Sequence, residues 1–283
     1  MGHTLQVFHA SHATGACMSV ADTAPSGPPV PRHRDDALKS VANTLDVLDC
    51  FLADDELGVS EVARNLGVAK SSAHRMLSTL AGRGFVEQNP GTGRYRLGLH
   101  LYELGQLSVS RSRLRQAALP IMEDLRQRTG HTIHLGVADG SDVVHLERLQ
   151  SREGLDIFDT LPARRFPTHC SATGKVLAAF DPAVAEARRR AAFPPITANS
   201  VRSVEEWDAT LAKIRRAGVA VNRDEVATGA MSVAAPIYDG TGRARAALSI
   251  VGRTEVMDRC EQQFTRLVVE AARRLGKIVP WGT

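Results

Sequence analysis

The sequence predicts an α+β fold in two parts: an N-terminal winged helix-turn-helix and a C-terminal antiparallel sheet with flanking helices. Between residues 37 and 97, segments with helical apolar spacing precede a pair of short strand-like runs around a turn-forming loop. From residue 113 onward, strand-like runs joined by short turns stand apart from amphipathic helices, which is typical of α+β domains. The chain has 283 residues, enough for two domains with separate cores.

The composition excludes several classes of protein. No apolar run approaches the roughly 20 residues of a membrane-spanning helix, and the chain does not open with the basic and apolar segments of a signal peptide. The cysteines never have C-x-x-C spacing, which argues against a zinc ribbon or a disulfide framework. The formal charge of +4 permits nucleic-acid binding without indicating it. We therefore expect a cytoplasmic protein with no membrane partner.

Residues 1–36 are expected to be a disordered tail. The run from Thr23 to Pro29 has no apolar period and ends in two adjacent prolines. Met18 offers an alternative translation start, and the sequence does not decide between Met1 and Met18. Helical apolar spacing begins at Ala37, so the first domain is expected to span residues 37–98.

This domain begins with an apolar stripe at helical spacing, which predicts a first helix. The stripe consists of Leu38, Val41, Leu45, Leu48 and Leu52. Ser60 is expected to be the N-cap of a short second helix, with Gly67 in the left-handed position after it. A tight turn then leads to another helix over about residues 70–80.

The helix at residues 70–80 is expected to have an apolar face and a small, polar, partly cationic face. The polar face contains Ser71, His74, Arg75 and Ser78. Such a face suits the DNA major groove, because hydroxyls approach phosphates and arginine makes paired hydrogen bonds to guanine. An ordinary solvated face has the same pattern, so this helix alone does not decide between the two interpretations.

The segment after this helix favours DNA binding. Residues 85–88 and 94–97 are expected to be strands around a loop of turn-forming residues, which completes a winged helix-turn-helix. Arginines on the second strand can contact phosphate or the minor groove. A winged helix that serves protein contacts is the alternative. The candidate DNA-binding residues are Lys70, Ser71, Ser72, His74, Arg75, Ser78, Arg94 and Arg96.

Over about residues 37–281 the sequence resembles the IclR family of bacterial transcriptional regulators. The resemblance rests on residues 68–80, 84–86, 95–98, 169–177, 234–239 and 246–250. It implies a GAF-like effector-binding domain, binding to near-palindromic double-stranded operator DNA, and assembly as a homodimer or homotetramer. Both repression and activation occur in the family, and we expect a repressor.

The remaining chain is expected to hold a linker and the effector domain. A linker helix is expected in residues 99–112, and the resemblance gives it a part in dimerisation. The effector domain is expected over residues 113–281. Within it, Ser203 with Glu206 fits a capping box and Thr254 is the expected cap of the last helix. Other helices are expected at about 114–129 and 171–180, and strands at 132–137, 143–149, 219–221, 231–238 and 244–251.

Local alignment with the resembled family places an effector pocket in this domain. Its expected lining residues are Ala172, Thr173, Asn222, Ser232, Ser249 and Val251. The family often has aspartate near Asn222, cysteine near Ser232 and serine near Val251. The neutral amide and the more apolar wall disfavour the smallest keto acids and favour a larger organic acid or an aromatic metabolite. The hydroxyls suit a carboxylate beside a helix N-terminus, or are satisfied groups of a packed core.

Two other kinds of chemistry are weighed. His169 and Cys170 suggest a thiol nucleophile, but sequence neighbours do not normally form a nucleophile–base pair, so no catalytic residue is expected. His131, His134 and His145 could converge with His169 and Cys170 on a metal, although in an extended strand the first two point to opposite faces. No metal and no cofactor are expected. A metabolite or metal sensor without DNA binding, or an enzyme that depends on Cys170, are the alternatives.

Overall fold

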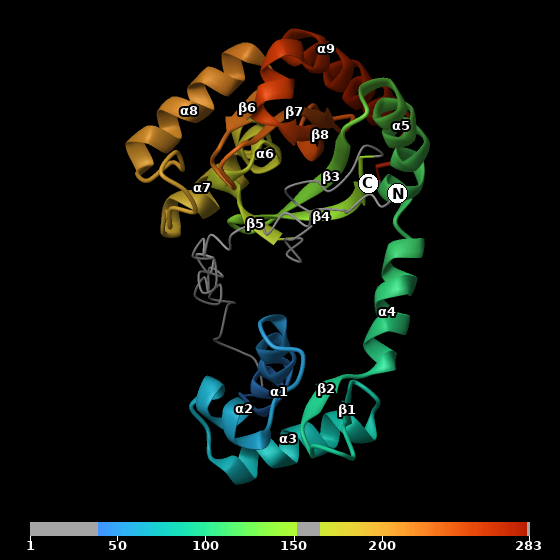
Figure 1. The fold of residues 1–283 in the computed structure, drawn as a ribbon, viewed down its shortest axis with the longest axis vertical. Helices are drawn as coiled ribbons and strands as arrows, with labels where there is room; N and C mark the ends of the chain where they lie inside the picture. The colour runs from blue at the N-terminus through green and yellow to red at the C-terminus, as the bar shows by residue number, and fades with distance from the viewer. Residues whose placement is uncertain (1–38, 152–164, 282–283) are drawn as a thin grey trace, which may run out of the picture. The chain divides into compact units, whose positions relative to one another are not determined.

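The computed structural model describes residues 39–151 and 165–281 (Figure 1). The expectations for the N-terminal tail and for Met18 lie outside these residues. In the described part of the chain, no helix combines the length and apolar character needed to cross a membrane.

The first domain has the predicted winged helix-turn-helix order. It consists of α1 (Lys39–Asp49), a 3-10 turn η1 (Cys50–Leu52), α2 (Val59–Leu66), α3 (Lys70–Gly82), β1 (Val86–Gln88) and β2 (Tyr95–Leu97). Its core includes Val47, Val62, Leu77 and Tyr95, so all three helices and the wing contribute to one apolar cluster. The strands β1 and β2 pair antiparallel, and a short bridge joins Leu57 to Tyr95.

The start of α2 differs from the prediction. Its N-cap is Gly58 and Ser60 lies inside the helix, so the assignment of Ser60 as the N-cap is wrong. The carboxylate of Glu61 accepts a hydrogen bond from the Gly58 N–H at 2.6 Å. A carboxylate at this position accepts a hydrogen bond from a backbone N–H at the helix start, and its negative charge interacts favourably with the positive end of the helix dipole. A hydroxyl cap is therefore not needed there. The predicted left-handed Gly67 is present, with φ of 63°.

Helix α4 (Leu99–Ser110) follows the wing, and α5 (Arg113–Thr129) begins the second domain. None of the side chains of α4 is buried, which agrees with a linker rather than a core helix. Only glycine fits at position 98, just before α4, because a Cβ there would lie 2.2 Å from the carbonyl oxygen of Gly84. The boundaries proposed at residues 98 and 113 remain a prediction.

The second domain is built on an antiparallel sheet, as predicted. The described strands follow the order β5-β4-β3-β8-β7-β6. They are β3 (Thr132–Asp139), β4 (Asp142–Leu149), β5 (Arg165–Pro167), β6 (Ala220–Arg223), β7 (Ala230–Tyr238) and β8 (Ala244–Arg253). The pairing of β3 with β4 is irregular between Leu135 and Gly136.

Helices cover both faces of this sheet (Figure 1). On one face, α5 and α9 (Thr254–Ile278) pack on strand residues such as Ile133 and Ile250. On the other, α6 (Ala172–Phe180) packs on strand residues such as Ala234 and Ala247, and α7 (Pro182–Arg190) and α8 (Val204–Ala217) pack against α6. The strand ladder therefore separates two apolar clusters, and α6 contributes to the second of them.

Several local predictions need correction. The sequence analysis did not predict α7 or β5, because α7 is short and rich in arginine and β5 has three residues. Thr254 is the first residue of α9 and its hydroxyl donates to Asp224 Oδ1 at 3.0 Å, so it is not the cap. Ser203 Oγ accepts from the Glu206 N–H as predicted, but the Glu206 carboxylate accepts from Arg202 N, so the capping box is half formed.

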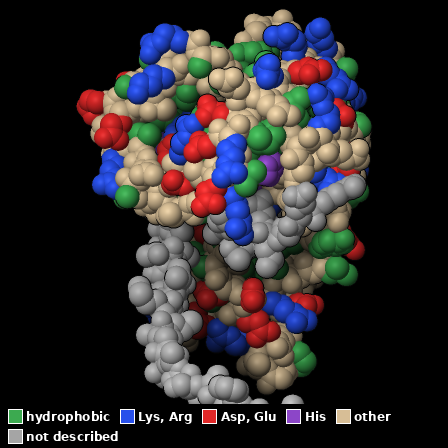
Figure 2. Space-filling model, turned by 45° about the horizontal axis from the view of Figure 1, so that its top comes forward, with side chains coloured by type: hydrophobic (Ala, Val, Ile, Leu, Met, Phe, Trp, Pro, Cys, Tyr) green, Lys and Arg blue, Asp and Glu red, His purple; other side chains and the backbone are tan. Residues whose placement is uncertain are grey.

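Charge is mixed on the face shown in Figure 2. There, Lys and Arg side chains alternate with Asp and Glu side chains over the surface. Ion pairs such as that of Arg223 with Asp258, at 3.0 Å, occur among the exposed charged side chains of the described residues. A continuous basic surface for DNA is therefore not found on that face of the described chain.

Candidate DNA-binding face and effector cavity

Helix α3 presents the predicted polar face to solvent. Lys70, Ser71, His74, Arg75 and Ser78 are exposed, and Ser72 is half-buried. The opposite side of the helix, with Ala73, Leu77 and Leu80, is buried in the domain core. The first turn of α3 has no side-chain cap, which leaves backbone N–H groups at its start. Exposed donors of this kind on the second helix of a helix-turn-helix can contact phosphates and base edges.

The two wing arginines differ in their surroundings. Arg94 Nη2 donates to the Glu56 carbonyl oxygen at 2.8 Å and lies 2.8 Å from Glu61 Oε2. Arg96 Nε donates to Glu87 Oε1 at 2.5 Å, and both side chains of that pair are about half exposed. Arg96 is therefore accessible from solvent, while Arg94 is directed toward the segment before α2.

A small cavity lies beside the N-terminus of α6 in the second domain, and its volume is about 20 Å³. A cavity of this size has room for about one water molecule, so a small-molecule ligand, whose sites occupy roughly 300–1,000 Å³, requires its walls to move apart. Ala172, Thr173, Ser232, Ser249 and Val251 line it, which are five of the six residues predicted for the pocket. The sequence analysis missed the further lining residues His134, His145, Phe166, Ser171 and Val226.

Glycines make this arrangement possible. A Cβ at Gly136 would lie 2.5 Å from Thr173 Cγ2 and 3.2 Å from His145 Cδ2, so the cavity floor needs a residue without a side chain there. A Cβ at Gly174 would lie 2.4 Å from Thr168 Cα, so α6 can approach the preceding 3-10 turn only with glycine. Ser171 Oγ accepts from Gly174 N at 2.9 Å and caps α6. Thr173 Oγ1 donates to Ser249 Oγ at 3.2 Å, which joins α6 to β8 across the cavity.

Two histidines lie together in the cavity wall. The rings of His134 on β3 and His145 on β4 are 4.3 Å apart between centroids, with 38° between their planes. His131 instead packs against Phe264 at 5.1 Å, and His169 Nε2 lies 3.0 Å from the Pro194 carbonyl oxygen. The five predicted metal-ligand candidates are thus dispersed. In the described parts of the chain, no three His, Cys, Asp or Glu side chains are grouped as for a metal.

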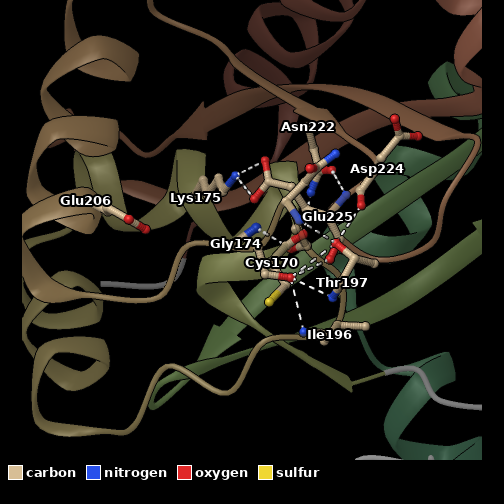
Figure 3. A network of polar contacts seen from close by, with 12 residues as sticks. Cys170, Gly174, Lys175, Ile196, Thr197, Glu206, Asn222, Asp224 and Glu225 are labelled. Carbon is tan, nitrogen blue, oxygen red and sulfur yellow. Dashed lines mark hydrogen bonds and ion pairs between the residues drawn. The ribbon is translucent and has the colours of Figure 1, made fainter.

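Asn222 does not line the cavity, contrary to the expectation from alignment. Its Nδ2 donates to the Cys170 carbonyl oxygen, and its Oδ1 accepts from Glu225 N at 3.2 Å (Figure 3). Both ends of the amide are therefore used inside the protein, behind the start of α6. An aspartate could not donate to the Cys170 carbonyl, so the neutral amide is the residue that fits this contact.

A buried ion pair lies in the same network. Lys175 Nζ on α6 contacts both carboxylate oxygens of Glu225 (Figure 3). The two side chains are 3% and 11% exposed. Burial raises the pKa of the Glu225 carboxyl, an effect that the Lys175 ammonium opposes. Ser200 Oγ also donates to the Glu225 carbonyl oxygen at 2.9 Å, so both the backbone and the carboxylate of Glu225 are held next to Val226 of the cavity wall.

The chemistry of Cys170 and His169 does not resemble that of a catalytic pair. Burial raises the pKa of the Cys170 thiol to about 11, and the residue is 0% exposed. Burial, together with the Arg188 guanidinium, lowers the pKa of His169 to about 4. At neutral pH the thiol is therefore protonated, a state in which cysteine is a poor nucleophile.

Comparison with known proteins identifies both domains. The helix-turn-helix domain model of the IclR family matches residues 40–90, and the model described as bacterial transcriptional regulator IclR C-terminal matches residues 106–277. The HTH-type transcriptional regulator XynR of Escherichia coli is 33% identical and covers 84% of this chain and 98% of its own. The glycerol operon regulatory protein of Streptomyces coelicolor is 35% identical over 77% of this chain and 85% of its own.

Solved structures agree with this assignment. An IclR homologue from Microbacterium hydrocarbonoxydans, in complex with 4-hydroxybenzoate, is 29% identical, covers 84% of this chain and 98% of its own, and superposes with a TM-score of 0.72. A regulator from Alicyclobacillus acidocaldarius is 25% identical, covers 86% of this chain and 99% of its own, and gives a TM-score of 0.74. The helix-turn-helix, the α+β domain and the matches over most of the chain together show that this protein belongs to the IclR family of transcriptional regulators.

Proposed function

We propose that this regulator is a cytoplasmic repressor, without catalytic activity, whose affinity for operator DNA is set by a small organic acid or aromatic metabolite. The observation that carries the proposal is the pairing of two features in one chain. One is the exposed polar face of α3 on a winged helix-turn-helix. The other is the small cavity beside the N-terminus of α6, which hydroxyl, imidazole and apolar side chains of the second domain line.

The DNA contacts are assigned to α3 and the wing. Lys70, Ser71, Ser72, His74, Arg75 and Ser78 belong to the helix that enters the major groove, and Arg96 on the wing contacts phosphate. Their exposure on one side of the domain supports this assignment, with Ser72 at its half-buried edge. Arg94 was predicted to contact DNA as well. Because it donates to the Glu56 carbonyl and pairs with Glu61, we assign it a different role, argued below.

Apolar side chains on the surface support a homodimer as the DNA-binding form. On α1, Val41 and Leu45 are 52% and 50% exposed, and on α4, Leu99 and Tyr102 are 68% and 63% exposed. Contiguous exposed apolar residues on a helix are typical of protein–protein contacts. Two copies would place two α3 helices on the successive major grooves of a near-palindromic site. Pairing of such dimers into a tetramer is compatible with this arrangement.

The cavity supports an anionic, partly apolar effector. Its described lining contains hydroxyl and imidazole groups at the N-terminus of α6 and no acidic side chain. Phe166, Val226 and Val251 supply an apolar wall that an aromatic ring can contact once the cavity widens to admit it. The relative bound to 4-hydroxybenzoate shows that this fold accommodates such a ligand in at least one other protein. Asn222 acts behind α6 and does not contact the effector in this proposal.

One experiment tests the proposal as a whole. Footprinting of the DNA upstream of the gene with the purified full chain should reveal a protected site with dyad symmetry. Titration with 4-hydroxybenzoate and related aromatic acids should then change the affinity for that site, and by reciprocity the DNA should change the acid's affinity by the same factor. Absence of a symmetric protected site contradicts the DNA-binding part, and a site whose occupancy no acid alters contradicts the effector class.

A further inference from the structure

A cluster of polar side chains joins the wing to the segment before α2. We call Glu56, Glu61, Asn89, Thr92 and Arg94 the wing cluster. Glu56 Oε1 accepts from Asn89 Nδ2 at 2.9 Å, and Glu56 Oε2 accepts from Thr92 Oγ1 at 3.4 Å, so one carboxylate holds both ends of the hairpin loop. Arg94 Nη2 reaches the Glu56 carbonyl oxygen and Glu61 Oε2, each at 2.8 Å.

The backbone connects the same two segments. Leu57 N donates to the Tyr95 carbonyl at 2.9 Å, and Tyr95 N donates to the Leu57 carbonyl at 2.8 Å. The chain before α2 therefore pairs with β2 beside the hairpin. The orientation of the wing relative to the helix-turn-helix depends on this pairing and on the side chains that flank it.

Glu61 links the wing to the start of α2. Its Oε2 accepts from the Gly58 N–H at 2.6 Å and also pairs with Arg94. The hydrogen bond from Gly58, followed by the Arg94 guanidinium, lowers the pKa of the Glu61 carboxyl, so the group is ionised at neutral pH. Its negative charge also lies at the positive end of the helix dipole. Glu61 thus contacts both α2 and the wing at once.

We propose that the Glu61–Arg94 pair positions the wing for DNA binding, and that Arg96 is the wing cation that contacts phosphate. This inference depends on the proposed function, since it assigns roles within the DNA-binding domain. Nη2 of Arg94 is directed at two acceptors of the protein itself. Arg96 has one exposed partner, Glu87, and exposed pairs of this kind are weak, so its guanidinium can exchange that partner for a phosphate.

Two carboxylates in this domain give a matched test. Glu61 and Glu87 each carry one negative charge and each pair with one wing arginine. Charge alone predicts that removing either one strengthens binding to polyanionic DNA. Under the proposal the two changes have opposite signs: Glu87→Gln releases Arg96 and strengthens binding, while Glu61→Gln weakens it because the wing is no longer held. Glutamine at position 61 can still accept from the Gly58 N–H.

The experiment compares four variants of the full chain by fluorescence anisotropy on its protected upstream duplex over a series of salt concentrations. Glu61→Gln and Arg94→Ala should weaken binding with an unchanged salt slope. Arg96→Ala should reduce the slope by about 0.9, the value for one lost phosphate contact. The proposal is overturned if Glu61→Gln and Glu87→Gln strengthen DNA binding equally. It is also overturned if Arg94→Ala and Arg96→Ala reduce the salt dependence of binding equally.

Amide hydrogen exchange gives a second readout that needs no DNA. The Tyr95 amide, bonded to Leu57, should exchange several-fold faster in Glu61→Gln and Arg94→Ala than in the wild type, and at the wild-type rate in Glu87→Gln and Arg96→Ala. Identical exchange in all four variants overturns the positioning role. If the wild-type chain binds no upstream DNA, the proposed function fails, and the exchange comparison still decides whether the Glu61–Arg94 pair holds the wing.

Discussion

Helix α3 and the candidate effector cavity differ in how their polar side chains are brought together. Most of the side chains proposed to contact DNA come from one continuous helix and are exposed at its surface. The cavity is lined from β3, β4, β5, α6, β7, β8 and the loop after β6, and most of its lining is buried. A change on α3 should therefore alter binding with little effect on stability, whereas a change around the cavity should alter both.

The largest expected effect is the loss of folding stability when the buried Lys175–Glu225 pair behind the cavity is disrupted. Glu225→Ala leaves the Lys175 ammonium buried without its partner, and such a loss costs about 3–5 kcal/mol. Urea unfolding of the purified chain measures this cost. The double variant Lys175→Met with Glu225→Leu should recover most of the stability, because it leaves neither charge buried. A single variant that unfolds at the wild-type urea concentration contradicts this account of the pair.

The second prediction concerns pH. The pKa of His169 is lowered to about 4 in the folded protein, below its ordinary value near 6.5. The unfolded chain therefore takes up a proton first as the pH falls, so the stability contributed by neutral His169 is complete above about 6.5 and is lost as the pH falls toward 4. The loss amounts to about 3 kcal/mol.

Urea unfolding at several pH values measures this loss. His169→Gln keeps a donor toward the Pro194 carbonyl and should flatten the curve between pH 6.5 and 4. The control is His74→Gln on the exposed face of α3, which should leave the curve unchanged. Parallel curves for the wild type and His169→Gln would show that this histidine does not contribute.

Arg75 tests the expectation that a change on α3 alters DNA binding with little effect on stability. Arg75→Ala should reduce discrimination between the operator and unrelated DNA by about 1–3 kcal/mol if the guanidinium contacts a guanine. Stability should change by no more than about 0.5 kcal/mol, because the side chain is exposed on α3. Competition binding with operator and random duplexes measures the first quantity, and thermal unfolding the second. A large loss of stability would mean that α3 is not an independent DNA-contacting surface.

The smallest expected effect is on the affinity for an aromatic acid when a hydroxyl of the cavity wall is removed. Thr173→Val keeps the shape of the side chain and removes the hydroxyl that donates to Ser249. The affinity for an aromatic acid should fall by about 1 kcal/mol, the typical contribution of one hydrogen bond. Calorimetry with 4-hydroxybenzoate measures it, and DNA binding without the acid should be unchanged. An unaltered affinity for an acid that binds the wild type would place the ligand away from Thr173.

The sequence predicted the elements with local signals well. The apolar and polar faces of α3 follow from helical spacing, and the strand–turn–strand order of the wing follows from its turn residues. Five of the cavity residues came from the family resemblance rather than from periodicity. His134 and His145 could not be assigned to the cavity, because their proximity depends on the register of β3 with β4 and on the missing side chain of Gly136.

Other parts depend on long-range contacts that no local pattern shows. Asn222 was placed in the cavity wall by alignment, while its contacts with Cys170 and Glu225 depend on the packing of β6 beside α6. Arginine is a residue type that often contacts DNA, which is why Arg94 was predicted to do so. Only the folded structure shows its bonds to Glu56 and Glu61. In both cases the residue type was recognised from the sequence, and its partners were not.

The buried Lys175–Glu225 pair also constrains how this protein can diverge. Because either single replacement strands a charge in the interior, relatives that lose one of the two residues must acquire a compensating change at the other in nearly the same evolutionary step. Drift at positions 175 and 225 should therefore be correlated across descendants, and an intermediate with one member replaced should be rare. The exposed residues of α3 carry no such coupling, so under the proposed function operator preference can change one residue at a time, while positions 175 and 225 change only together.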